Sequence, residues 1–338
     1  MTGLTGPGGL TRHLLRRLGG AVLVLLALSV LVYALFYLVP GDPARLACGE
    51  RCNPQQIAQV RSQLGLDQSV FAQYAHFLQG LFTGRDYSTG TGVLHCDAPC
   101  LGLSYQNDQQ VTQLILERLP ATASLALGAM VVWLAVGIGT GLLSALRRGG
   151  PTERLLTLLT LAGTGTPVFI LGLLLLMAVC AYLQWLPFPS YVPLGEDPEQ
   201  WAWNMLLPWL TLGLFESAKY ARITRGATLE TLADDHIRTF RAYGVGERAI
   251  VTRHALRGAV PPVIALTAID LGTMFGGAVL TESLFGIPGL GKTLIDAVRH
   301  VDLPVVVGVV LLMGVAVVVA NVVADLLYAL ADRRVALA

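Results

Sequence analysis

Long apolar segments alternate with polar ones along the whole chain. Six stretches are apolar enough to cross a bilayer, which takes about 20 residues of helix. Because lipid offers no partner for backbone polar groups, each stretch is expected to be helical. The pattern predicts an all-α, polytopic membrane protein with about six transmembrane helices. The expected spans are roughly 18–39, 121–146, 155–186, 205–224, 259–282 and 305–330.

Two of these expected spans are irregular. Glycines and a proline at 163–167 predict that the third span is tilted or broken near its start. The fourth is cleanly apolar only over 205–215, because Glu216 and Lys219 then interrupt it. These two charges are three residues apart, which predicts a local ion pair on one helix face.

Composition agrees with lipid as a second solvent. Apolar residues make up 54% of the chain and charged residues 13%, against about 25% charged in soluble domains. The net charge of +1 gives no sign of electrostatic capture of nucleic acid. The first apolar stretch is longer than the core of a signal peptide and lacks a small-residue cleavage site, so it is expected to be a retained span.

The placement of Lys and Arg sets the expected orientation. With the N-terminus inside, 16 of the 23 basic residues fall on inner segments, as the positive-inside rule requires. We therefore expect a multi-pass protein of a bacterial plasma membrane with both termini cytoplasmic. The expected parts are a cytoplasmic N-terminus 1–17, the span 18–39, an extracytoplasmic loop 40–120, and a core 121–334 with an inner loop 225–258.

The inner loop has the pattern of two helices separated by a glycine. Asp234 or Asp235 can cap the first helix, and Gly244 can end it in a left-handed turn. A second helix is expected from Glu247 up to the prolines at 261–262. Periodicity alone leaves open an amphipathic helix resting on anionic headgroups. The apolar side chains of the first helix recur at helical spacing, at Ile237, Phe240 and Tyr243.

The residues of this loop resemble the EAA loop of ABC importer permeases, in the form found in the dipeptide/oligopeptide family. The matching residues are Ile237, Arg238, Thr239, Arg241, Ala242, Gly244, Arg253, His254, Ala255, Leu256, Arg257, Ala259 and Pro261. Phe240, Tyr243 and Gly258 depart from the family pattern. Further matches lie at 40–43, 64–67 and 117–122, and at Asn321 and Asp325 near the end of the chain.

The resemblance implies a type I ABC importer permease fold with a large extracytoplasmic loop. It implies four partners: a second homologous permease, two ATP-binding subunits and an extracytoplasmic substrate-binding protein. ATP and Mg would be bound by the partners, with no cofactor in this chain. Peptides are the expected cargo, with nickel, glutathione or another small solute as alternatives. The residues expected to couple to the ATPase are Asp235, Ile237, Arg238, Thr239, Phe240, Arg241, Ala242, Tyr243 and Gly244.

A phosphate-loop pattern, G-x-x-x-x-G-K-[ST], occurs at 286–293 with Lys292 in the phosphate-binding position. Such a loop requires an α/β nucleotide domain, and the segment between the last two spans is too short for one. Charge placement also puts it outside the cell. We expect a glycine/proline turn followed by a short helix at 294–301, and no enzymatic activity. A membrane ATPase using Lys292 and a secondary transporter are the competing hypotheses.

Polar groups inside spans are costly and usually face a cavity or the helix bundle. Asp270 has no evident partner in the sequence, so pathway lining and packing are both open. Asn321 and Asp325 share a helix face, which favours helix–helix hydrogen bonding over contact with substrate.

Four of the five cysteines, Cys48, Cys52, Cys96 and Cys100, lie in the expected outer loop as two C-x3-C pairs. That location is oxidising and favours disulfides, for which four cysteines allow three connectivities. The spacing also suits a zinc site, and His95 beside Cys96 is a further possible ligand, so a metal site stays an open alternative. Cys180 is expected to be a buried thiol.

Overall fold

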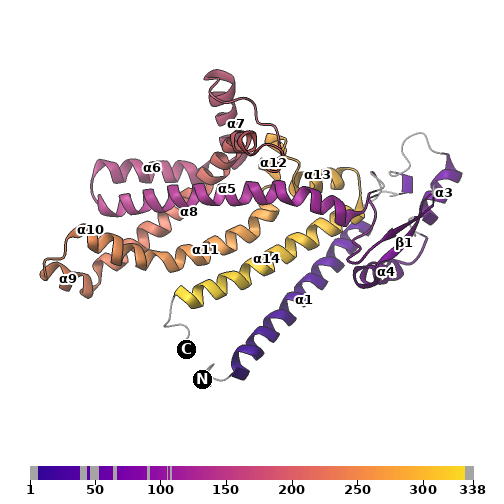
Figure 1. Cartoon of the computed structure of the whole chain (residues 1–338), viewed down its shortest axis with the longest axis horizontal. Coiled ribbons are helices and arrows are strands. Elements are labelled where there is room, and N and C mark those ends of the chain that lie inside the picture. The colour runs from indigo at the N-terminus through magenta and orange to yellow at the C-terminus, as the bar shows by residue number, and fades with distance from the viewer. Residues whose placement is uncertain are drawn as a thin grey trace. The chain divides into compact units, whose positions relative to one another are not determined.

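The structure is a computed structural model that describes residues 7–38, 44–45, 53–63, 67–89, 92–104, 106 and 109–331. The chain divides into two compact units. The core unit comprises residues 1–13, 123–287 and 316–338, and the loop unit comprises 14–122 and 288–315. Figure 1 shows the chain coloured by residue number, with helices and strands of both units labelled.

Helices make up the described part of the core unit. The central helix is α8, Pro198–Ala233, against which α6, α7 and α11 pack. It starts at Asp197, whose carboxylate accepts from the backbone N–H groups of Glu199 and Gln200 at 3.0 Å. The others are the later part of α5 (Val111–Leu146), α6 (Pro151–Gly165), α7 (Val168–Leu175), the π-helical η1 (Leu176–Tyr182), α9 (Asp235–Ala242), α10 (Glu247–Ile250), the π-helical η2 (Val251–Ala255), α11 (Leu256–Gly277), α12 (Val279–Phe285) and the end of α14 (Leu303–Ala331).

Small residues let α5 and α8 approach each other closely. A Cβ atom on Gly137 would lie 2.5 Å from Cβ of Tyr220, and one on Gly141 would lie 2.5 Å from the carbonyl oxygen of Ala221. Beside this contact Trp133 stacks on Tyr220, with ring centroids 5.9 Å apart and both side chains fully buried. Helix association in membranes depends on such close packing.

The break expected in the third apolar stretch is confirmed. Helix α6 ends at Gly165, Pro167 follows in extended conformation, and α7 begins at Val168. The α6 segment and the continuous α7–η1 segment are bent by 109° relative to each other. Proline cannot donate a backbone hydrogen bond and disfavours helix in the residue before it.

The loop unit combines helices with one small sheet. It contains most of α1 (Pro7–Leu38), then α3 (Pro54–Gln63), α4 (Val70–Thr83), the start of α5, α13 (Leu290–Arg299) and the start of α14. Strands β1 (Arg85–Thr89) and β2 (Gly92–Cys96) pair antiparallel, with Asp86 opposite His95. An apolar cluster joins α5, α13 and α14 through the buried residues Val111, Leu114, Ile115, Leu290, Ala297, Val305, Val306 and Val309.

Three described helices are long and apolar enough to cross a membrane: Val111–Leu146, Glu247–Met274 and Leu303–Ala324. The bent pair Pro151–Gly165 and Val168–Tyr182 makes a fourth if it is one span, and Gly19–Ala34 in α1 is a shorter apolar helix. The charged α8 does not meet this test. The six-span topology therefore stays a prediction.

Two boundaries differ from those expected. Pro261 and Pro262 lie inside α11 and do not bound the second loop helix. A proline in a membrane helix is tolerated where neighbouring helices and side chains satisfy the backbone groups that it frees. The helix expected at 294–301 is α13, which starts earlier, at Leu290, where the backbone N–H donates to the hydroxyl of Thr122 at 2.8 Å.

Candidate functional site

Helix α9 lies between the C-terminal end of α8 and the start of the helical run α10–η2–α11 (Figure 1). The short helix and the glycine turn expected here are both confirmed. Gly244 follows α9 with φ 77°, a left-handed conformation that suits glycine. Asp234 occupies the N-cap position, but its carboxylate makes no capping hydrogen bond with this helix.

One side of α9 is fixed to its neighbours. Ile237 is fully buried, and the ring of Phe240 lies 4.4 Å from that of His254 on η2. Arg241 donates to both carboxylate oxygens of Glu247, Nε to Oε1 at 2.6 Å and Nη2 to Oε2 at 3.3 Å. This two-point pairing links α9 to the first residue of α10.

The other side of α9 faces outward. Tyr243 is 83% exposed, and Arg238 makes only a long contact of 3.9 Å with the exposed carboxylate of Asp235. A guanidinium and an aromatic ring left at a surface are the residue types that protein interfaces favour. The exposed residues of the predicted coupling segment are Asp235, Arg238, Thr239, Arg241, Ala242, Tyr243 and Gly244.

The ends of α8 and α11 are close together behind α9. A Cβ atom on Gly258 would lie 2.1 Å from the hydroxyl of Thr231. Gly258 is one of the departures from the family pattern, and its missing side chain allows this approach.

The predicted inner loop 225–258 is helical over most of its length, because α8 extends to Ala233, α9 follows it, and α10 begins at Glu247.

A polar cluster joins α8 and α11 further along. The expected pair of Lys219 and Glu216 is confirmed at 3.0 Å. Lys219 Nζ also lies 2.7 Å from Oδ2 of Asp270, to which the hydroxyl of Tyr220 donates at 2.8 Å. Asp270 is 7% exposed and is held by both groups. The sequence shows no partner for Asp270 because its partners lie on another helix, and its role in the pathway stays a prediction.

The structure says less about Asn321 and Asp325, the other two residues expected near the pathway. Asn321 is exposed on α14. Asp325 belongs to the same helix, but its side chain lies outside the described residues. Their role in the pathway stays a prediction.

The segment with the phosphate-loop pattern has a different local structure from a nucleotide site. Helix α12 precedes it where a phosphate loop follows a strand. Leu290, at the start of α13, is fully buried, and its N–H already donates to Thr122. The backbone group that would face a phosphate is therefore occupied, and Lys292 lies on a packed helix.

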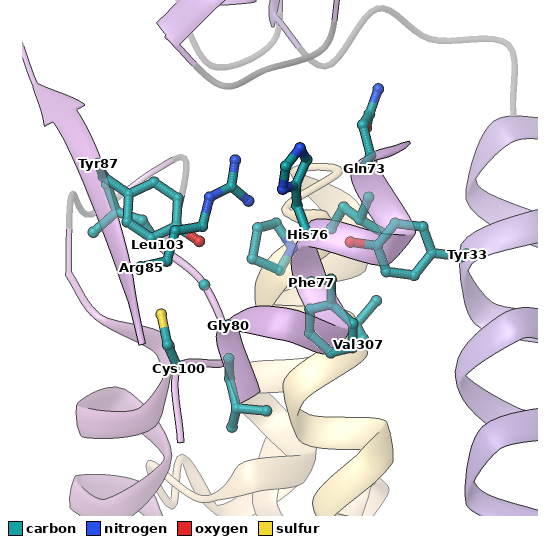
Figure 2. Close-up of a pocket in the computed structure, with 14 residues that line it drawn as sticks. Tyr33, Gln73, His76, Phe77, Gly80, Arg85, Tyr87, Cys100, Leu103 and Val307 are labelled. Atoms are coloured by element: carbon teal, nitrogen blue, oxygen red, sulfur yellow. The ribbon is translucent and has the colours of Figure 1, made fainter. Parts of the chain in front are cut away.

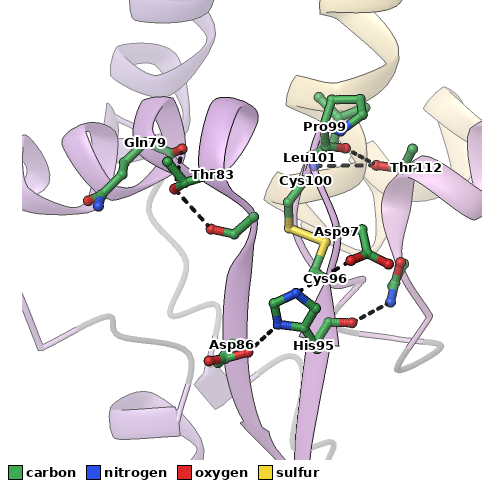
Figure 3. Close-up of a disulfide and its surroundings, with 12 residues drawn as sticks. Gln79, Thr83, Asp86, His95, Cys96, Asp97, Pro99, Cys100, Leu101 and Thr112 are labelled. Carbon is green, nitrogen blue, oxygen red and sulfur yellow. Dashed lines mark hydrogen bonds and ion pairs between the residues drawn. A yellow bond between two sulfur atoms is a disulfide. The ribbon is translucent and has the colours of Figure 1, made fainter.

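Cys96 and Cys100 form a disulfide with Cα atoms 5.6 Å apart (Figure 3). This is one of the alternatives that the sequence left open for these two residues, and Cys48 and Cys52 lie outside the described residues. Beside the disulfide, Nδ1 of His95 lies 2.5 Å from Asp86, and Nε2 lies 3.4 Å from Asp97. Hydrogen bonding to the Asp86 carboxylate raises the pKa of His95. No cluster able to hold a metal occurs in the part of the chain that the structure describes.

Cys180 is the expected buried thiol. It is 5% exposed and lies in η1, where its Sγ is 3.4 Å from the carbonyl oxygen of Pro187.

Comparison with known proteins gives the class. Residues 137–337 match the family described as binding-protein-dependent transport system inner membrane component, and residues 10–126 match its N-terminal counterpart. The first match alone covers more than half of the chain. The chain therefore belongs to this family, whose members are ABC transporter permeases that pass several times through the inner membrane.

Relatives of known description match over nearly the whole chain. A Brucella abortus protein described as a peptide transport system permease is 37% identical over 326 residues, 96% of this chain and 99% of that one. The Escherichia coli dipeptide transport system permease protein DppB is 34% identical over 348 residues, 96% of this chain and 98% of its own.

A solved structure supports the fold. The methionine ABC transporter MetNI in inward-facing conformations matches with a TM-score of 0.54 at 18% identity, over 66% of this chain and 98% of that one.

Proposed function

We propose that this permease forms half of the translocation pathway of an ATP-driven importer for di- and oligopeptides. The peptide cargo is supported by relatives that are described as peptide and dipeptide permeases and that match this chain over nearly their full length. In this proposal the chain pairs with a second homologous permease, two ATP-binding subunits and an extracytoplasmic binding protein. It holds no ATP or Mg itself.

The observation that carries the coupling mechanism is the two-sided character of α9. Ile237 and the Arg241–Glu247 pair fix the helix to the core unit, while Arg238, Thr239 and Tyr243 remain exposed. A force applied to the exposed side reaches α8 and α10–α11 together, because α9 lies between them in the chain. Closure of two ATPase subunits would thereby shift both long helices and alternate the access to the pathway.

The contact chemistry favours a protein partner with surface carboxylates. Arg238 offers a planar fork of donors that suits a carboxylate in two-point geometry. Tyr243 supplies apolar area with one polar end, as interface anchors do. An anionic membrane surface would also attract the arginines, but it would give no fixed contact to Thr239.

Site-specific cross-linking tests this assignment. Thr239→Cys should cross-link to a cysteine introduced in the docking cleft of the partner ATPase, and the yield should change when ATP is added. Thr83→Cys is the matched control, because Thr83 is also exposed but belongs to α4 in the loop unit. Failure of every position from 235 to 243 to cross-link would contradict the coupling role of α9.

Two activity measurements separate the competing hypotheses. Lys292→Ala in the assembled transporter should leave ATP hydrolysis unchanged, because Lys292 lies on a packed helix of the loop unit. Replacing the catalytic glutamate of the partner ATPases should abolish peptide uptake. Uptake that persists in that variant would indicate a secondary transporter, and hydrolysis by the isolated chain would indicate an ATPase.

A further inference from the structure

A large cavity lies within the loop unit, between the start of α5 and the segment that carries α13. Its volume is about 380 Å³, and it is open to solvent. Ligand sites typically measure about 300–1,000 Å³. Its wall is apolar at Leu114 and Val305, and three charged residues also line it: Arg118, Asp296 and Asp302.

Arg118 and Asp296 are oppositely charged, yet they form no ion pair with each other. The Nε atom of Arg118 is buried, and within the described residues it has no hydrogen-bond partner. Leaving such a donor unsatisfied is costly, by about 1–3 kcal/mol. The carboxylate of Asp296 likewise has no salt bridge to a described residue; only its backbone carbonyl is engaged, by Nδ1 of His300 at 2.8 Å.

The carboxylate of Asp302, unlike that of Asp296, already has a hydrogen-bond partner among the described residues. Asp302 is 3% exposed and accepts a hydrogen bond from the hydroxyl of Ser104 at 2.5 Å. This carboxylate is therefore already paired with a residue 198 positions earlier in the chain. The charged groups that remain to meet a ligand are the guanidinium of Arg118 and the carboxylate of Asp296.

We propose that this cavity binds the two charged ends of a short peptide, with its α-carboxylate on Arg118 and its α-ammonium on Asp296. The inference rests on the proposed peptide-importer function and adds a subsite to it. A zwitterion satisfies both groups at once, whereas a metal cation or a simple anion satisfies only one. Leu114 and Val305 give a side chain of the peptide an apolar surface.

A second pocket of the loop unit provides the contrast. Its volume is only about 40 Å³, and it is lined by Arg85 and His76 with aromatic walls from Tyr33, Phe77 and Tyr87 (Figure 2). The guanidinium of Arg85 lies 5.0 Å from the centroid of the Tyr87 ring. No carboxylate occurs among the described residues that line this pocket, so it offers no negative charge to an ammonium group.

The test uses the assembled transporter without its binding protein, so that selection by that protein does not contribute. A radiolabelled dipeptide carrying a photoreactive diazirine side chain is cross-linked, and the labelled segments are mapped by mass spectrometry. Competitors are the free dipeptide, its C-terminal amide and its N-acetyl derivative. We expect labels on segments around Leu114 and Val305. Each blocked peptide should compete at least about tenfold more weakly than the free dipeptide.

Crossed variants identify the two contacts. With Arg118→Gln the C-terminal amide should compete as well as the free dipeptide, while the acetylated peptide remains weak. With Asp296→Asn the reverse should hold. Arg118→Lys keeps the charge and should keep the preference for a free carboxylate, and Arg85→Gln in the other pocket should leave both preferences unchanged.

The outcomes distinguish failure of the proposed subsite from failure of the proposed peptide-importer function. Peptide uptake by the complete transporter is measured in parallel. Uptake without labelling at the cavity, or with selectivity that Arg118→Gln and Asp296→Asn leave unchanged, overturns the subsite alone. Absence of peptide uptake overturns the proposed function and the subsite together.

Discussion

Lys219 and Asp270 are joined across two helices, with Nζ and Oδ2 2.7 Å apart. Lys219 comes from α8 and Asp270 from α11, the two helices that lead to and from the α9 segment. The same carboxylate accepts a hydrogen bond from Tyr220. This contact fixes α8 against α11, so that the two helices are expected to move together when α9 is displaced.

Asp270→Asn should lower the melting temperature of the permease, because Lys219 then keeps only Glu216 as an acidic partner. Asp270 is buried but Lys219 is 39% exposed, so water screens part of the loss. We expect a cost of about 1–3 kcal/mol.

The double variant Asp270→Asn with Lys219→Met provides the control for that cost. Removing both charges should recover part of the stability, as in other buried pairs. Thermal unfolding of the single and double variants in detergent gives the coupling energy. Simple additivity of the two single effects would contradict a direct interaction.

Close packing of α5 against α8 makes a second prediction. Gly141→Ala should destabilise the permease by about 1–3 kcal/mol, because the added Cβ meets the backbone oxygen of Ala221, which cannot move aside. Gly139 lies on the same helix with nothing within 4 Å of its Cβ position. Gly139→Ala should therefore be neutral or stabilising by up to about 1 kcal/mol. Equal melting temperatures for the two variants would contradict the tight contact at Gly141.

Features of the chain that depend on neighbouring residues were predictable from the sequence. The short helix from Asp235 follows from the helical spacing of Ile237 and Phe240, and the left-handed Gly244 follows from turn chemistry. The break near Pro167 follows from the missing backbone donor of proline. The ion pair of Glu216 and Lys219 follows from helical spacing.

Features that depend on distant residues were not predictable. Tyr220 and Asp270 are 50 residues apart, and no local pattern specifies which helix faces which. At the start of α13, the N–H of Leu290 donates to the hydroxyl of Thr122, which is 168 residues away. Pro261 and Pro262 indicate a helix end by local rules, yet they lie inside α11, after the π-helical η2. Arg118 and Asp296 share a cavity only because α5 and α13 pack together in the loop unit.

The hairpin of the loop unit should be more stable at mildly acidic pH. The Asp86 carboxylate raises the pKa of His95 in the folded hairpin above its unfolded value. A raised pKa means that the folded state binds the proton more tightly. The stabilisation is fully present below the unfolded pKa, about 6.5, and is lost as pH rises through the raised folded value.

Hydrogen exchange of the β1–β2 amides, measured across this pH range and corrected for intrinsic exchange, checks the direction. Asp86→Asn should reduce the pH dependence while keeping the imidazole, and the smaller contribution of Asp97 should remain. Protection that instead increases as pH rises would contradict the assigned pairing.

A charge exchange tests the link between α9 and α10. Arg241→Glu should reduce the coupling of ATP hydrolysis to peptide uptake, because two glutamates would then face each other where Arg241 and Glu247 now pair. Glu247→Arg should do the same. The double exchange restores opposite charges at the same positions and should recover much of the uptake per ATP hydrolysed. Arg253→Glu is the matched control, since Arg253 is exposed on the adjacent η2. If the double exchange is as defective as the single variants, the pair does not transmit the motion of α9.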